Sequence, residues 1–149
     1  VNYLVEIGGE IRAHGDGKEG KGWTVALEDG SPGKTNGLAT VSLLNYSVAT
    51  SGTYRQTKPN PDSTKPASHL IDPRTGQPVE HNLVAVNVLA PTARNADALA
   101  TALMILGPEE GPVLAGEMDL IARFGIKEGN RTRQVHTPAW ERLFPVANR

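Results

Sequence analysis

The sequence contains no cysteine and almost no excess charge of either sign. The lack of cysteine excludes disulfides, a thiol nucleophile and cysteine-ligated zinc or iron–sulfur sites. Lys and Arg (15) nearly balance Asp and Glu (16), so no basic field exists to hold nucleic acid or an anionic membrane surface. No apolar run reaches the roughly 20 residues that cross a bilayer. We therefore expect no nucleic-acid partner and no membrane-spanning segment, while the compartment stays open.

The common nucleotide-binding and hydrolase fingerprints are also missing. No G-x-G-x-x-G opens a helix, and neither the P-loop pattern G-x-x-x-x-G-K-[ST] nor the nucleophile elbow G-x-S-x-G occurs. Folds that bind nucleotides through those motifs are therefore not expected.

Short apolar and β-branched segments separated by turn residues are the main local pattern. They predict strands at 3–7, 10–13, 23–27, 38–44, 46–49, 83–89 and 120–124, with turns at Gly8-Gly9 and at 29–33. The proline-rich polar stretch 58–67 predicts a loop. Polar residues follow from Lys127 onward, apart from Trp140, Leu143 and Phe144, which we expect to dock on the body of the domain.

The apolar period changes to three and four residues between 93 and 106, which predicts a helix. Thr92 is its expected N-cap and Gly107-Pro108 its expected end. A short second helix is expected over 109–116. A length of 149 residues with 38% hydrophobic and 21% charged residues suits one domain, 1–149. We predict an α+β fold, a largely antiparallel sheet with one main helix and a short second helix packed on it.

The segment His69–Gly76 holds the densest group of chemically useful residues. Its Asp-Pro-Arg-Thr-Gly sequence is also good turn chemistry, and residue types alone favour a structural turn. Its place after a long polar connection favours a functional loop instead.

Asp97 and Thr101 form a second candidate site, because a spacing of four places both on one helix face. Two oxygens suit Mg²⁺ that completes its coordination with water and substrate phosphates. The alternative is an Asp stabilised by the helix dipole beside a solvated Thr. Two weaker clusters, Thr50–Arg55 and Gly8–Glu10, can each be ordinary turns or bulges.

Together these clusters resemble the ApbE family of bacterial flavin transferases, the FAD:protein FMN transferases. The resemblance implies that FAD is cleaved at its pyrophosphate, that FMN is joined to a threonine hydroxyl of an acceptor protein, and that AMP leaves. The matching stretches are Val5–Ile11, Ala49–Gly52 with Tyr54 and Arg55, His69–Gly76, and Ala96–Ala102 leading to Leu106 and Gly107.

The resemblance also implies roles for particular residues. Asp97 and Thr101 would bind Mg²⁺, and His69 would act as base or acid and contact the nucleotide. The FAD pocket would include Ile71 and Asp72 together with the residues that shape its backbone, Gly8, Gly9, Ser51 and Gly52.

The chain departs from the family pattern in its coverage. A segment resembling Gly-Gly-x-Ala-Lys-Gly belongs upstream and is not matched, so the resemblance covers the carboxyl-terminal half. We expect that the N-terminal half, absent here, completes the enzyme and that this chain alone is inactive. Thr53 also stands where many relatives carry an acidic or amide side chain.

Many relatives are lipoproteins at the periplasmic face of the inner membrane, which would make the membrane a partner only through a lipid anchor absent here. Two alternatives stay open: a protein that binds or stores FAD without transferring it, and a structural or interaction domain without a ligand.

Overall fold

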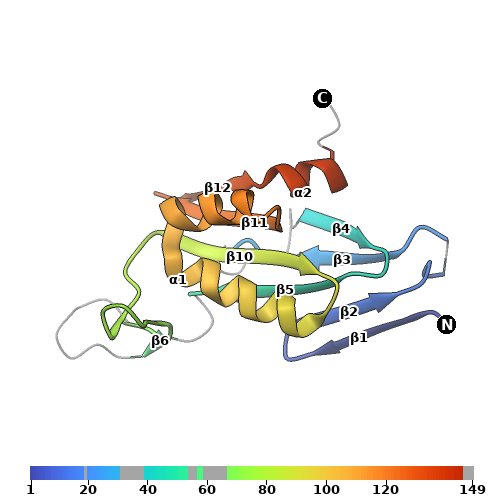
Figure 1. Ribbon diagram of the computed structural model, residues 1–149, viewed down its shortest axis with the longest axis horizontal. Coiled ribbons are helices and arrows are strands. Elements are labelled where there is room, and N and C mark those ends of the chain that lie inside the picture. The colour runs from blue at the N-terminus through green and yellow to red at the C-terminus, as the bar shows by residue number, and fades with distance from the viewer. Residues whose placement is uncertain (19, 31–38, 54–56, 59–66, 146–149) are drawn as a thin grey trace.

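The fold, seen in a computed structural model, centres on one six-stranded sheet (Figure 1). The structure describes residues 1–18, 20–30, 39–53, 57–58 and 67–145. The sheet has the order β1-β2-β5-β10-β11-β12, and every neighbouring pair is antiparallel. Its strands are β1 (Tyr3–Ile7), β2 (Glu10–His14), β5 (Ser47–Gly52), β10 (Leu83–Ala90), β11 (Ile121–Glu128) and β12 (Arg131–His136). The predicted α+β fold is confirmed.

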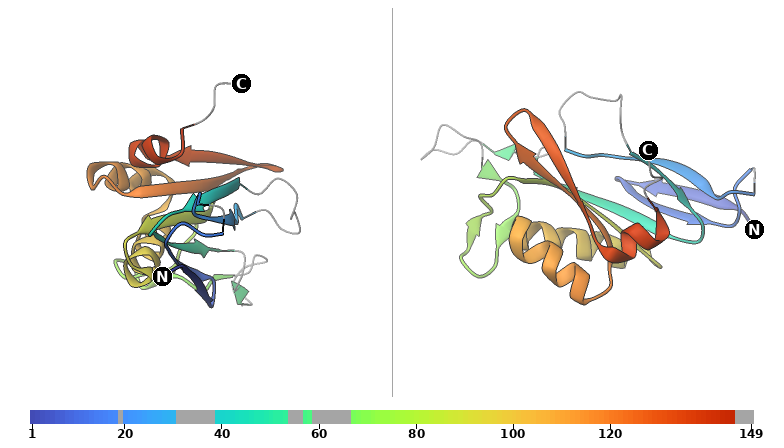
Figure 2. Two further views of the ribbon diagram at one scale, coloured as in Figure 1. Left: turned by 90° about the vertical axis from the view of Figure 1, so that its right-hand side faces the viewer. Right: turned by 90° about the horizontal axis from the view of Figure 1, so that it is seen from above.

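Different layers cover the two faces of this sheet (Figure 2). The helix α1 (Ala93–Glu117) packs on one face around Phe124, Leu103 and Val86. On the other face, the hairpin of β3 (Trp23–Leu27) and β4 (Ala39–Leu43) buries Leu27 and Leu43 against the sheet. Alternation along each strand sends successive side chains to opposite cores. The central strand β10 is therefore apolar on both faces, as its sequence predicts.

Two pairs of very short strands and a short helix near the end complete the described chain. The strands β6 (Thr57–Lys58) and β7 (Ala67–Ser68) pair at the two ends of the expected loop, most of which lies outside the described residues. The strands β8 (Ile71–Asp72) and β9 (Gln77–Pro78) form the turn predicted from Asp-Pro-Arg-Thr-Gly. Neither described helix combines the length and apolar character that crossing a bilayer requires.

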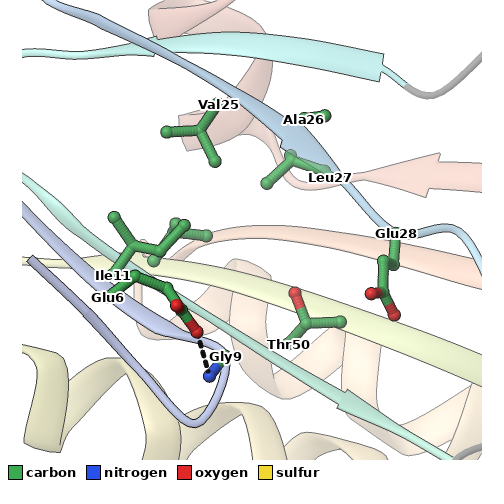
Figure 3. A pocket seen from close by; sticks show the side chains of 9 residues that line it. Glu6, Gly9, Ile11, Val25, Ala26, Leu27, Glu28 and Thr50 are labelled. Carbon is green, nitrogen blue, oxygen red and sulfur yellow. Dashed lines mark hydrogen bonds between the residues drawn. The ribbon is translucent and has the colours of Figure 1, made fainter.

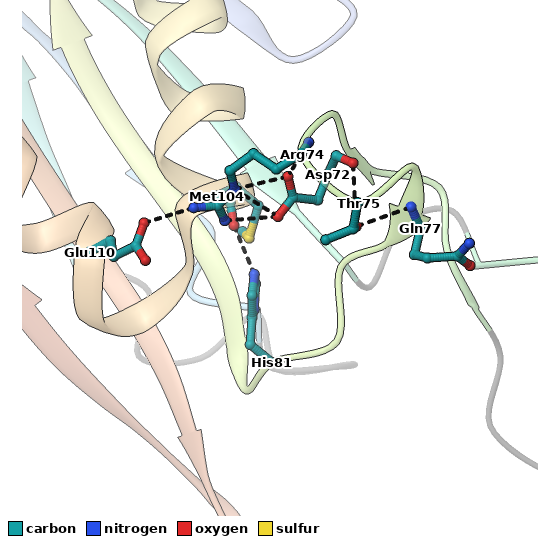
Figure 4. A network of polar contacts seen from close by, with 7 residues as sticks. All are labelled: Asp72, Arg74, Thr75, Gln77, His81, Met104 and Glu110. Atoms are coloured by element: carbon teal, nitrogen blue, oxygen red, sulfur yellow. Dashed lines mark hydrogen bonds and ion pairs between the residues drawn. The ribbon is translucent and has the colours of Figure 1, made fainter.

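The helix α1 is capped and broken where the sequence predicts. Thr92 accepts a hydrogen bond from the Asn95 N–H (3.2 Å), and Gly107 has non-helical angles (φ 84°, ψ −171°). The expected second helix follows this kink, so α1 consists of two helices that meet at Gly107. Pro108 has no N–H for the Met104 carbonyl four residues earlier, and His81 replaces it, with Nε2 donating at 2.9 Å (Figure 4).

We expect Gly107→Ala to destabilise the domain. The backbone angles of Gly107 are open essentially to glycine alone, and an added Cβ would lie 2.9 Å from the His81 ring. The expected loss in free energy of unfolding is about 1–3 kcal/mol, measured by urea denaturation. Gly116→Ala is the matched control, because that helical glycine has open space around it. The control should gain about 0.5–1 kcal/mol, and equal effects at both glycines would contradict the prediction.

The end of the chain differs from the expectation. The last predicted strand is too short, since β11 continues to Glu128, and the polar segment from Arg131 forms a further strand, β12. The segment of β12 lacks an apolar alternation because it is an edge strand with much solvent exposure. A short helix, α2 (Pro138–Leu143), then docks as expected through Trp140, which is buried and lies 5.0 Å from the Phe144 ring. Docking through Leu143 is wrong, because that side chain is 38% exposed.

His136 gives the folded state a pH dependence. Burial, and then the charge of Arg123 across the β11–β12 pair, lower the pKa of its imidazole, while Glu141 acts in the opposite direction. The unfolded chain therefore takes up a proton near the ordinary value of about 6.5, where the folded chain resists it. Stability from this group is complete above that pH and falls as the pH decreases below it.

We expect the Tm of the wild type to fall between pH 7 and pH 5 more steeply than that of His136→Phe. In the wild type the His136 ring stacks on the Trp140 ring, with the two centroids 5.7 Å apart. Phenylalanine keeps an aromatic ring at this position but cannot titrate. Calorimetry at several pH values in one ionic strength measures the two slopes. Parallel slopes would show that His136 does not contribute.

Candidate functional site

A cavity of about 230 Å³ opens where the β1–β2 turn, the end of β5 and the first turns of α1 meet. We call it the Asp97 cavity. It collects residues from four separate parts of the chain and includes six of the nine residues predicted for the site. Its lining consists of Gly8, Glu10, Thr50, Ser51, Gly52, His69, Leu70, Asp97 and Thr101.

Local geometry explains why these side chains converge. Asp97 and Thr101 lie one helical turn apart on α1. Ser51 lies on the face of β5 that α1 covers, and its hydroxyl is 3.0 Å from that of Thr101, with either group able to donate. Gly8 has a φ of 68°, which lets the β1–β2 turn reverse tightly beside them. The cavity wall is thus built from β5, α1, the β1–β2 hairpin and the connection between β7 and β8.

The donors in this cavity fit a hard cation. Carboxylates of Asp97 and Glu10 and hydroxyls of Ser51 and Thr101 offer only oxygen, the ligand that Mg²⁺ prefers. Within the described part of the chain, no group of three His, Cys, Asp or Glu side chains is placed to hold a metal. A metal here would therefore need further oxygens from water or from a substrate phosphate. The assignment of Mg²⁺ to Asp97 and Thr101 stays a prediction.

His69 contributes the imidazole of the cavity and is half-buried. The backbone on its carboxyl side is pinned, since Leu70 N–H donates to the Ser68 hydroxyl (3.2 Å) and the Leu70 carbonyl accepts from Val79 N–H (3.0 Å). The Leu70 side chain packs against the core beneath α1. His69 is therefore held beside the predicted metal ligands, and its catalytic role stays a prediction.

Asp72 and Ile71 lie outside the Asp97 cavity. The Asp72 carboxylate accepts hydrogen bonds from the Arg74 backbone N–H and guanidinium at 2.8 to 3.1 Å, and Arg74 also binds Glu110 of α1 (3.0 Å; Figure 4). These hydrogen bonds from Arg74 lower the pKa of Asp72 and raise that of Arg74. Ile71 is 47% exposed. Both residues hold or border the β8–β9 turn, and their predicted contact with the nucleotide stays untested.

Gly9 lies on a second cavity, of about 180 Å³, on the sheet face that β3 covers (Figure 3). Its N–H donates to the Glu6 carboxylate at 2.8 Å. The wall combines apolar side chains of β3, β2 and β5 with the polar Glu6, Glu28 and Thr50. Thr50 belongs to both cavities, so the end of β5 separates them.

Three cavity residues received no role from the sequence: Glu10, Thr50 and Leu70. Signals for two of them were present. Glu10 follows the glycine pair directly, and Thr50 begins the Thr-Ser-Gly stretch. No local pattern marks Leu70, because its place follows from packing of the distant helix α1.

Comparison with known proteins places nearly the whole chain in the family that the sequence motifs resemble. The model of the ApbE family matches residues 1–124. The FAD:protein FMN transferase of Klebsiella pneumoniae (strain 342) is 38% identical over 147 residues, which is 99% of this chain and 41% of that protein. The transferase of Escherichia coli (strain K12) is 38% identical over 139 residues, 93% of this chain and 39% of that protein.

Solved structures agree in fold. The apo flavinyl transferase ApbE of Pseudomonas stutzeri superposes with a TM-score of 0.82 at 39% identity, covering 99% of this chain and 45% of that one. The flavin transferase ApbE from Vibrio cholerae gives 0.80 at 34% identity, covering 96% and 44%. These matches group the chain with flavin transferases, of which it spans about two fifths of the length. The chain belongs to the ApbE family.

Proposed function

We propose that this chain supplies one wall of a magnesium-dependent FAD:protein FMN transferase. The observation that carries the proposal is the Asp97 cavity itself, where an imidazole, two carboxylates and several hydroxyls from distant segments converge beside a glycine-lined backbone. Names of relatives support the use of FAD and the transfer of FMN. The threonine acceptor, release of AMP and dependence on Mg²⁺ belong to the proposal.

The proposed reaction is a phosphoryl transfer. The acceptor threonine oxygen bonds to the phosphorus of the FMN half of FAD, the bond from that phosphorus to the bridging oxygen breaks, and AMP leaves with the electron pair. His69 takes the proton of the attacking hydroxyl, as a neutral imidazole can near pH 7. The Ser51 hydroxyl, bonded to Thr101, limits the movement of the Thr101 oxygen. Positioning and charge neutralisation are the main demands of such a step.

Asp97 and Thr101 would hold the magnesium ion, with Glu10 close enough in the cavity wall to contribute a carboxylate. When bound, the ion supplies positive charge to the pyrophosphate oxygens. The oxygen atoms of these three side chains support this choice over a softer metal.

The partners follow from the same proposal. An acceptor protein must present a threonine to the cavity, and residues equivalent to the remaining length of the relatives would supply the opposite wall. We also propose, from the family resemblance alone, that the enzyme works at the periplasmic face of the inner membrane through a lipid anchor outside this sequence.

The test combines a longer protein containing this chain with FAD, Mg²⁺ and an acceptor protein. Covalent flavin appears as in-gel fluorescence on the acceptor, and AMP is measured by chromatography. We expect equimolar flavin attachment and AMP, both abolished by a metal chelator. Tight FAD binding without AMP would instead support the storage protein, and no binding of FAD or Mg²⁺ would support a structural domain.

A further inference from the structure

A row of polar side chains crosses the sheet directly behind the Asp97 cavity. Strand register places Thr50 of β5 opposite Asn87 of β10, and Asn87 opposite Arg123 of β11. Residues opposite one another in register point to the same face. That face is the one β3 covers, because Val48 and Leu89, two residues away on the same strands, belong to the core beneath β3 and β4.

Hydrogen bonds join the members of this row. The Asn87 Nδ2 donates to the Thr50 hydroxyl oxygen (2.9 Å) and to the Glu28 carbonyl (3.1 Å), and its Oδ1 accepts from Arg123 Nη1 (3.2 Å). A guanidinium can only donate, so Arg123 fixes which side of the amide carries the oxygen. The amide nitrogen must then face Thr50. Every hydrogen-bonding group of the Asn87 amide is used.

Burying this polar row costs desolvation free energy, which argues against a role in stability alone. Asn87 is 1% exposed and Arg123 is 5% exposed, within a strand pair whose other buried residues are mostly apolar. Burial of the guanidinium lowers the pKa of Arg123. Apolar side chains of similar volume fill such a position without this desolvation, whereas a satisfied polar network fixes one geometry.

The polar network fixes the position of the end of β5, which is hydrogen-bonded on both faces of the sheet. Asn87 binds Thr50 on one face, and on the other the next residue, Ser51, bonds to Thr101. We propose that Asn87, oriented by Arg123, is a positioning residue of the Asp97 cavity: it fixes the end of β5 so that Ser51 meets Thr101. Its link to catalysis rests on the proposed function, but its effect on the contact between Ser51 and Thr101 does not.

Asn87→Asp is the first test variant. Aspartate has nearly the same shape and still accepts from Arg123, but its second oxygen repels the Glu28 carbonyl and can meet Thr50 only by accepting from that hydroxyl, so the end of β5 should shift. Thr50→Val removes the bond between Asn87 and Thr50 outright and serves if Asn87→Asp does not fold. The control is Ile126→Val, which trims a buried side chain of β11 outside the row.

Nuclear magnetic resonance of this chain measures the contact directly. We expect the cross-relaxation between the Ser51 β protons and the Thr101 methyl group to weaken at least twofold in both test variants. The control should keep the wild-type intensity at a similar loss of Tm. Wild-type intensity in a folded Asn87→Asp or Thr50→Val chain would overturn the proposal.

A second measurement uses flavin transfer by the longer protein. Misplacing a group behind a metal ligand should raise the Mg²⁺ concentration for half-maximal rate about tenfold, whereas loss of folded protein lowers the maximal rate and leaves that concentration unchanged. An unchanged half-saturation in Asn87→Asp would overturn the catalytic part of the proposal. If the wild type transfers no flavin, the proposed function fails, and the resonance measurement still decides the role of Asn87.

Discussion

Asp97→Asn should lower flavin transfer about 100-fold or more at a fixed, moderate Mg²⁺ concentration. Asparagine keeps the size of the side chain but removes the negative charge that would hold the cation. Few protein oxygens surround this position, so the loss of one carboxylate cannot be offset by a dense ligand cage. Rates measured over a Mg²⁺ titration should show a raised half-saturation with partial recovery at high Mg²⁺.

Glu109→Gln is the matched control for this substitution. Glu109 is an exposed carboxylate on the same helix but lies outside the cavity. It should keep the wild-type rate and the wild-type response to Mg²⁺. An Asp97→Asn enzyme that labels its acceptor at the wild-type rate would remove Asp97 from the metal site, whatever the fold of the chain.

Local patterns in the sequence were sufficient for most of the longer elements and for much of the cavity. Thr92, Gly107 and the β1–β2 glycine turn each act through their own backbone neighbourhood, so their roles follow from residue type. The spacing of Asp97 and Thr101 likewise fixes their common helix face. The packing of α1 on the sheet cannot be deduced in this way, and it is this packing that brings Ser51 to Thr101.

The errors have the same physical origin. The edge strand β12 has no buried alternation to reveal it, and its pairing with β11 supplies the missing information. In the sequence Asn87 is a single polar residue within an apolar run. Its partners Thr50 and Arg123 could not be predicted, because they follow from the register of three strands. The Asp72 assignment is a different case: it comes from the family resemblance and stays a prediction, and the partner that the structure shows for Asp72 is Arg74, two residues away.

His69→Gln should lower the rate of flavin transfer by about 100-fold to 10,000-fold. Glutamine can still donate and accept hydrogen bonds, but it cannot take a proton from the attacking hydroxyl near neutral pH. The affinity for FAD should change only a few-fold, because the glycine-lined backbone and Ser51 remain in place. Single-turnover attachment of flavin measures the rate, and quenching of flavin fluorescence measures the affinity.

The comparison with Asp97→Asn separates a proton acceptor from a metal ligand. Loss of His69 should leave the Mg²⁺ half-saturation unchanged and should not recover at high Mg²⁺, because the missing function is proton transfer and not charge. His14→Gln is the control, since that imidazole stacks on Tyr3 in the β1–β2 pair and lies outside the cavity. A His69→Gln enzyme that regains the full rate at high Mg²⁺ would place His69 in the metal environment and leave the proton acceptor elsewhere in the assembled site.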